Sequence, residues 1–315
     1  MSYTKTTNGA TSLKTTGSNI VDYFMMFSRD LDKNTSYEYL EKCWNDDPKK
    51  TVAIIFNGRD RVGGKKEKKV SNEAMIWLRT YKFATYCDNV TNYVDKYGCW
   101  KDLLYITYYH DKTSLNKNYE LQVFSKKLLN DKLLLEDNNS VSLCAKWAPS
   151  ENDRNDKRKH MAKRVATEIY GLSDDKRMEK YRKDIIVPLR KKINIVESLI
   201  CSDRWGEIKY ETVPGVASKR LLNAFMKHDY DRYIQYLSDV RSGKAEIKVT
   251  GILPHELSKY YIDTRHNNDY GPNETIELQW RTILENVKKS GNFDNSLAIV
   301  DLSGSMFGAR NGCNP

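Results

Sequence analysis

The sequence lacks the features that define several large classes of protein. It contains no stretch approaching the roughly 20 apolar residues of a membrane span, and its N-terminus has no apolar signal-peptide core. The six cysteines are scattered, with no Cys-x-x-Cys pair and no histidine at zinc-finger spacing. We therefore expect an intracellular, cytoplasmic protein with reduced thiols and no membrane partner.

Catalytic motifs are also missing. There is no Gly-x-Ser-x-Gly elbow, no paired-carboxylate motif and no Cys-His signature, and the histidines form no His-x-x-x-His pair. The stretch Gly58–Lys68 is glycine-rich, but a Walker phosphate loop needs Gly where Arg59 stands and Ser or Thr where Lys66 stands. We therefore expect an exposed turn at Gly58–Lys68 and a protein that is not an enzyme.

Positive charge is what the sequence has in excess. The net charge is +10 and the pI about 9.1, which favours an anionic partner. Between Arg154 and Lys192 there are 14 Lys and Arg against 6 Asp and Glu, and a second basic run spans Arg59–Lys69. One interpretation is that the first run contacts a phosphate backbone, while the rings of Tyr170 and Tyr181 offer faces on which bases could stack. The alternative is that the run is the solvated surface of a lysine-rich protein. The candidate nucleic-acid contacts are Arg154, Lys157, Arg158, Lys163, Arg164, Lys176, Arg177, Arg182 and Lys183.

Hydrophobic periodicity predicts a mainly α-helical fold. A buried helix face is predicted by apolar residues at i, i+3, i+4 and i+7, namely Ala74, Trp77, Leu78 and Tyr81. Further helices are predicted from Pro188, over Ala217–Tyr236, from Pro254 and over Ile276–Val287. We expect a flexible tail over residues 1–19, then an α-helical domain over residues 20–292 whose helices pack pairwise like HEAT repeats.

The last part of the chain has a different pattern. The apolar run Leu297–Val300 predicts a buried strand, and Asp301, Ser303 and Ser305 follow it in Asp-x-Ser-x-Ser spacing. One carboxylate and two hydroxyls aimed at one point suit Mg²⁺. The pattern resembles the metal-ion-dependent adhesion site that opens a von Willebrand factor A domain, an α/β fold whose later loops add a Thr and an Asp to the ion.

Only ten residues follow Ser305, too few for the rest of such a domain. We therefore expect residues 293–315 to hold the first strand and metal loop of a truncated A domain. Mg²⁺ would then occupy an incomplete site, or a partner chain would complete the domain; the alternative is a vestigial loop that binds no metal.

Several motifs together resemble one family, domain of unknown function 2828, in which a helical region precedes a C-terminal von Willebrand A domain. The matching residues are Arg59-Asp60, Gly63-Gly64-Lys65 and Glu67; Tyr97-Gly98 and Trp100-Lys101-Asp102-Leu103; Ser142-Leu143 and Lys146-Trp147-Ala148-Pro149; Tyr181-Arg182 and Pro188-Leu189-Arg190; Trp205, Ile208, Tyr210 and Val213-Pro214; and Leu253-Pro254-His255-Glu256. Relatives tend to read Gly-Gly-Lys-Gly-Glu-Arg where this chain has Lys66, a residue without a glycine's backbone freedom.

The architecture of that family is similar to the Ro autoantigen, or TROVE, proteins, in which a ring of helical repeats binds RNA beside an A domain. The resemblance implies a non-enzymatic, RNA-binding, ribonucleoprotein-like scaffold. Because the family extends to large DNA viruses, the alternative is a protein-interaction or structural component of a virion that does not bind nucleic acid.

Overall fold

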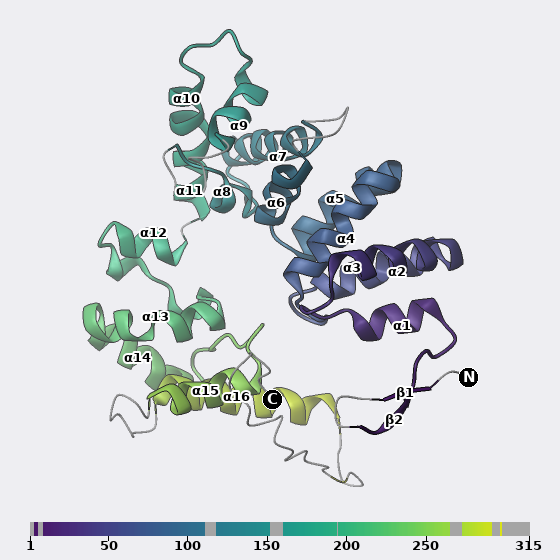
Figure 1. The fold of residues 1–315 in the computed structure, drawn as a ribbon. Coiled ribbons are helices and arrows are strands. Elements are labelled where there is room, and N and C mark those ends of the chain that lie inside the picture. Colours follow the sequence, from purple (N-terminus) through teal and green to yellow (C-terminus); the bar gives the residue numbers. More distant parts are fainter. Residues whose placement is uncertain are drawn as a thin grey trace. The chain divides into compact units, whose positions relative to one another are not determined.

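The fold is built almost entirely from helices. The structure is a computed structural model that describes residues 3–5, 9–110, 118–151, 160–193, 195–264, 273–291 and 297. The chain divides into two compact units, Met1–Ile195 (unit 1) and Val196–Pro315 (unit 2), and both consist mainly of helices (Figure 1). The predicted mainly α-helical class is confirmed, and the boundary between the units falls inside the expected helical domain. None of the described helices is both long and apolar enough to cross a membrane.

Unit 1 opens with a small hairpin and continues as consecutive helices. The antiparallel strands β1 (Tyr3–Lys5) and β2 (Thr11–Leu13) lie in the segment expected to be a tail. The helical elements are α1 (Asn19–Met26), α2 (Lys33–Asp46), α3 (Pro48–Arg59), α4 (Lys68–Tyr81), α5 (Phe83–Asn92), the π-helical turn η1 (Tyr93–Tyr97), α6 (Trp100–His110), α7 (Tyr119–Glu136), α8 (Cys144–Trp147), α9 (Met161–Tyr170), α10 (Arg177–Lys180), the π-helical turn η2 (Tyr181–Ile186) and α11 (Val187–Ile193).

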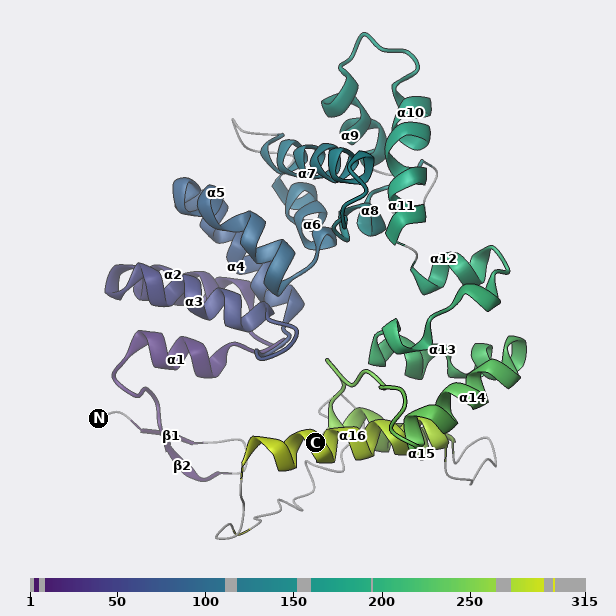
Figure 2. The same ribbon diagram turned by 180° about the vertical axis from the view of Figure 1, so that it is seen from behind.

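Local sequence explains where several of these helices begin. The Asp32 carboxylate caps α2 by accepting from the backbone N–H groups of Asn34 and Thr35, each at 3.0 Å. At the start of α3, Asp47 accepts from the N–H of Lys50 at 3.0 Å, and Pro48 occupies the first turn, where no N–H is needed. Helices α2, α3 and α4 then pack against one another (Figure 2).

The core of unit 1 includes most of the helix face predicted from the sequence. Ala74 and Leu78 of α4 are fully buried, and Trp77 is 2% exposed. The fourth member, Tyr81, is 58% exposed, so its assignment to this face is wrong. Tyr81 is the last residue of α4, where the chain turns into α5, and its ring lies beside Trp77 at the edge of the core.

Pro188 does not start a helix as predicted. It lies inside a helical run that extends without interruption from Arg177 to Ile193 through α10, η2 and α11. Proline has no N–H to donate, and the π-helical turn η2 directly precedes it, where the N–H of Val187 reaches back to the carbonyl of Arg182. A wider turn before a proline is a recognised way to keep such a helix continuous.

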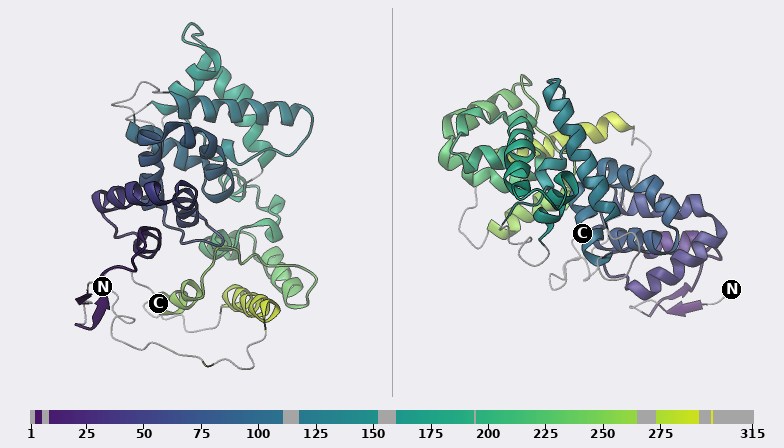
Figure 3. Two further views of the ribbon diagram at one scale, coloured as in Figure 1. Left: turned by 90° about the vertical axis from the view of Figure 1, so that its right-hand side faces the viewer. Right: turned by 90° about the horizontal axis from the view of Figure 1, so that it is seen from above.

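Unit 2 has an aromatic core. Its helices α13 to α16 are drawn in green to yellow in Figure 3. Tyr210 stacks on Tyr236 with ring centroids 5.4 Å apart and meets the edges of Phe225 and Tyr233. Phe225, Tyr233 and Leu237 are buried in this core. The elements are α12 (Val196–Cys201), the 3-10 turns η3 (Trp205–Glu207) and η4 (Tyr210–Thr212), α13 (Gly215–His228), α14 (Tyr230–Arg241), α15 (Pro254–Thr264) and α16 (Glu274–Ser290).

The predicted A-domain start cannot be compared with this structure. Asp301, Ser303 and Ser305 lie outside the described residues, and of the preceding apolar run only Leu297 is described. The helical repeat stays a prediction as well.

Candidate nucleic-acid interface

The predicted cationic surface is carried by α9 and by the helical run α10–η2–α11. Lys163 and Arg164 lie in α9, Lys176 directly precedes α10, and Arg182 and Lys183 lie in η2. Arg177 is the first residue of α10. Arg154, Lys157 and Arg158 lie outside the described residues.

Part of this positive charge is neutralised within unit 1. Lys183 pairs with Glu179 at 2.6 Å, and Lys180 pairs with Asp174 at the same distance. The hydrogen bond from Lys183 lowers the pKa of Glu179, and that from Lys180 lowers the pKa of Asp174, so both acids stay charged beside the cations. The Lys183–Glu179 pair is exposed and the Lys180–Asp174 pair is partly exposed, so a phosphate ligand would compete with weak pairs.

Arg177 and Arg164 contact the protein rather than open solvent. The Nη1 group of Arg177 donates to the carbonyl oxygens of Asp174 at 2.9 Å and Leu172 at 3.3 Å, which fixes the turn before α10. The half-buried Arg164 donates to the Met161 sulfur at 3.5 Å. These two residues of the predicted set therefore have structural contacts.

The two tyrosines expected to stack on bases differ from that expectation. Tyr181 is 2% exposed and donates from its hydroxyl to the carbonyl of Pro149 at 3.1 Å. Its ring belongs to the core, so the predicted stacking role is wrong. Tyr170 is half-buried, and the Lys180 ammonium lies 5.9 Å from its ring centroid.

Four cations of this segment remain open to a partner. Lys163, Lys176, Arg182 and Lys191 are exposed, and within the described ranges their side chains form no ion pair and no hydrogen bond. Lys191, in α11, was not among the predicted contacts, although it belongs to the same basic run. Sequence shows the excess of charge but not which cations a neighbouring acid neutralises.

Part of the second basic run, Arg59–Lys69, is engaged in contacts within unit 1. Arg59 is 5% exposed and pairs with the buried Asp102 at 2.8 Å. Lys68 also reaches Asp102, at 3.3 Å, and the Lys65 ammonium donates to the carbonyl oxygens of Phe24 and Phe27. These three side chains are therefore engaged in contacts within unit 1.

The turn at Gly58–Lys68 is packed rather than fully exposed. Gly58 is buried, and a Cβ there would lie 2.3 Å from the Phe27 ring; a Cβ at Gly64 would lie 1.9 Å from the carbonyl of Asn57. Lys66 has φ of +62°, in the left-handed region that favours glycine. Glycine, the residue expected at this position in relatives, would adopt this conformation without strain.

Four of the motifs that suggested a family resemblance contact one another in unit 1. Arg59 of the first motif pairs with Asp102 of the second, and Lys101 of the second lies 5.7 Å from the ring centroid of Trp147 in the third. Arg190 of the fourth donates to the carbonyl oxygens of Ala145 at 3.0 Å and Ala148 at 2.7 Å. These residues therefore tie successive helices of unit 1 together.

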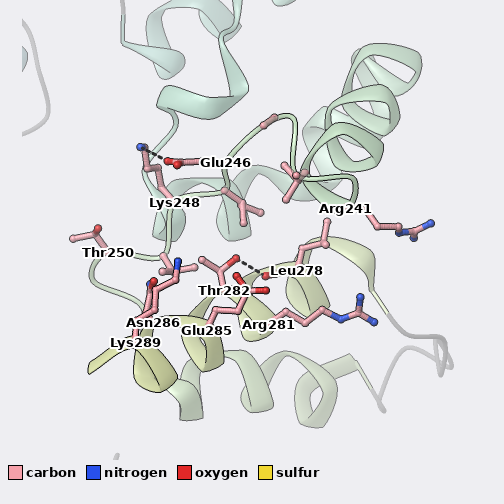
Figure 4. Close-up of a pocket in the computed structure, with 15 residues that line it drawn as sticks. Arg241, Glu246, Lys248, Thr250, Leu278, Arg281, Thr282, Glu285, Asn286 and Lys289 are labelled. Atoms are coloured by element: carbon pink, nitrogen blue, oxygen red, sulfur yellow. Dashed lines mark hydrogen bonds and ion pairs between the residues drawn. The ribbon is translucent and has the colours of Figure 1, made fainter. Parts of the chain in front are cut away.

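Unit 2 contains a polar groove of about 490 Å³ between the segment that follows α14 and one side of α16 (Figure 4). Its α16 wall includes Arg281, Thr282, Glu285 and Lys289. The groove carries both signs of charge. Among the described residues, no cluster of three or more His, Cys, Asp or Glu side chains is arranged to hold a metal ion.

The fold and these sites define a mainly helical protein with a buried ion pair, Arg59–Asp102, and a partly free cationic surface. The sequence matches the family described as "Domain of unknown function (DUF2828)" over residues 6–121 and 121–293, and the chain belongs to this family. It is 32% identical over 331 aligned positions to "Uncharacterized protein L728" of Acanthamoeba polyphaga mimivirus, an alignment that covers 96% of this chain and 56% of the relative. The chain thus spans little more than half the length of that viral relative. No solved structure matches the sequence.

Proposed function

We propose that this protein is a non-enzymatic scaffold that binds RNA through its phosphate backbone. The observation that carries the proposal is the set of four exposed, unpaired cations along α9 and α10–η2–α11. A protein gains affinity for a polyanion chiefly by releasing the counterions that its cations displace, and an already paired cation contributes less to this release. The four residues are Lys163, Lys176, Arg182 and Lys191.

The expected mode of binding follows from the side chains around these cations. Tyr181 is buried, so base stacking on its ring plays no part. Contacts to phosphates fix position and carry no sequence information by themselves. The protein should therefore bind with little sequence preference, and the choice of RNA over DNA rests on the architectural resemblance to Ro proteins.

Charge reversal of the four cations tests this proposal. The variant carries Glu at positions 163, 176, 182 and 191. Its control carries Glu at four other exposed positions of unit 1 that form no ion pair in the described ranges, namely Lys49, Lys69, Lys96 and Lys126. Both variants lose the same net charge, so only a localised site distinguishes them.

Affinity for fluorescent single-stranded RNA at fixed salt is the measurement, with circular dichroism to confirm folding. We expect the affinity of the first variant for RNA to fall at least about tenfold, which is about 1.4 kcal/mol of binding free energy, and that of the control to fall much less. Equal losses in the two variants would show a diffuse effect of net charge and contradict the assigned surface. Absence of binding by the unaltered protein at low salt would contradict the function itself and favour a protein-interaction role.

A further inference from the structure

The ring of Trp147 lies beside two lysine side chains that come from different helices. The Lys101 ammonium of α6 lies 5.7 Å from the centroid of this ring, and the ammonium of Lys146, the preceding residue of α8, lies 5.6 Å from it. At these distances neither nitrogen is in van der Waals contact with the centre of the ring. Trp147 is half-buried, so part of its indole surface is open to solvent.

Two hydrogen-bond donors beside this ring have no partner among the described residues. The indole Nε1 of Trp147 forms no hydrogen bond there and is accessible to solvent. The corresponding nitrogen of Trp100, by contrast, donates to the Asp95 carboxylate at 3.1 Å. Lys101 is exposed, and in the same described ranges its ammonium forms no ion pair and no hydrogen bond. Both donors are therefore available to a ligand.

Other rings of unit 1 that lie near a lysine offer less. The half-buried rings of Tyr37, Tyr39 and Trp44 each have one ammonium group nearby in the described part of the chain, at 5.2, 5.0 and 5.3 Å from the ring centroid. Trp77 also has one, at 5.9 Å, but this side chain is only 2% exposed. Trp147 therefore combines an accessible ring with cations from two helices.

This site adjoins the cationic surface of unit 1. The Arg190 guanidinium of α11 donates to the carbonyl oxygens of Ala145 at 3.0 Å and Ala148 at 2.7 Å, the two residues that flank Lys146 and Trp147 in the chain. Helix α8 contacts both α11 and α6 and lies between them (Figures 1 and 2). The residue after Arg190 is Lys191, one of the four free cations, so the Trp147 ring lies next to one end of that surface.

We infer that Trp147 stacks on an unpaired base of single-stranded RNA, with the ammonium groups of Lys101 and Lys146 donating to acceptors on the edge of that base. This inference rests on the proposed function and adds the ligand class, because a base within a duplex is already stacked and cannot lie on the ring. Proteins that bind single strands combine cations along the backbone with aromatic rings on which bases stack. Every base has a π face, so such stacking agrees with little sequence preference.

A ligand without bases tests this inference. The affinity of the full-length protein for single-stranded RNA is compared, at fixed salt, with its affinity for an abasic ribose-phosphate oligomer of the same length. The two ligands carry the same charge, so the ratio of the two affinities measures the contribution of the bases. We call this ratio the base contribution.

Trp147→Leu keeps the apolar bulk of the side chain and removes the aromatic face. It should lower the base contribution at least about fivefold, while the affinity for the abasic oligomer changes by less than about twofold. The salt dependence of RNA binding should not change, because tryptophan carries no charge. Trp147→Phe retains a ring and should retain most of the base contribution.

The matched control is Trp280→Leu in α16. Trp280 is 37% exposed, and among the described residues no cation lies near its ring. This control should leave the base contribution unchanged. Circular dichroism and urea unfolding establish that each variant is folded.

A surface variant tests the same site without altering the half-buried ring. Lys101→Met changes an exposed side chain of α6 and should lower the base contribution at least about twofold, the effect of one lost hydrogen bond. Its control is Lys126→Met, an exposed lysine of α7. If Trp147→Leu does not fold, Lys101→Met decides the question.

The outcomes separate this inference from the proposed function. Salt-dependent RNA binding with a base contribution that Trp147→Leu leaves unchanged would overturn the role of Trp147 and leave the phosphate-binding function intact. Failure of the unaltered protein to bind either ligand at low salt would overturn both.

Discussion

Removing the Asp102 carboxylate should strongly destabilise unit 1. Asp102 is fully buried, and its Oδ2 accepts from the Arg59 Nε at 2.8 Å and from the Cys99 N–H at 3.0 Å. Its Oδ1 lies 3.3 Å from the Asn72 amide nitrogen and 3.3 Å from the Lys68 ammonium. This single carboxylate therefore connects α3, α4 and the start of α6.

The expected magnitude follows from the partner left behind. Burial by itself lowers the pKa of Arg59, but the charge and hydrogen bond of Asp102, together with the nearby Tyr93 and Cys99, outweigh it, so the pKa is raised and the guanidinium is charged. Asp102→Ala leaves that charge buried without a counterion, which costs about 3–5 kcal/mol when a buried pair loses one member. Replacing both members by apolar residues, as in Arg59→Met/Asp102→Leu, should cost less than either single change, because no unpaired charge remains.

Urea unfolding measures these differences. The control is Glu179→Ala, which removes the acid of an exposed pair with Lys183, and exposed pairs of this kind contribute little to stability. We expect a large shift of the midpoint for Asp102→Ala and almost none for the control. A destabilisation by Asp102→Ala of less than about 1 kcal/mol would refute the view that this pair clamps the helices.

Two further predictions concern backbone strain and pH. Lys66→Gly should stabilise unit 1 by about 0.5–1 kcal/mol, because removing the strain of a left-handed backbone conformation outweighs the added freedom of the unfolded chain. Lys66→Ala keeps that strain and should not stabilise unit 1. Equal effects of the two substitutions in urea unfolding would contradict this reasoning. Burial raises the pKa of the Cys43 thiol to about 11 from an ordinary value of 9.0. The unfolded state then loses its proton first, so the stability contributed by this group is complete below pH 9 and is lost as pH rises toward 11. Between pH 8 and pH 10 the free energy of unfolding should decrease less in Cys43→Ala than in the unaltered protein. In a separate test, the exposed thiol of Cys201 should react with thiol reagents long before the buried thiol of Cys43.

The fold was predictable where one periodicity dominates a long segment. The spacing of Ala74, Trp77 and Leu78 placed three residues in the core because a helix buries one stripe. Pro188 misled the prediction, because a proline is compatible with both a helix start and an interior position after a wider turn. The division into two units at Ile195 has no local signal, since it depends on which helices pack together.

The candidate sites were predictable in composition but not in geometry. The basic run from Arg154 to Lys192 was visible as an excess of charge, yet only packing reveals that Tyr181 faces the core. Arg59 looked like a surface cation because its partner Asp102 is distant in sequence.

The salt dependence of RNA affinity tests the central claim most directly. The affinity of the full-length protein for single-stranded RNA is measured from low to physiological salt, beside single-stranded DNA and duplex RNA. If the four free cations contact phosphates, the logarithm of the binding constant should fall with the logarithm of salt concentration with a slope of about −3, from about −0.7 per contact. Such a slope, together with a preference for RNA, is the result we predict; no binding at low salt, or an affinity that does not depend on salt, would contradict the account.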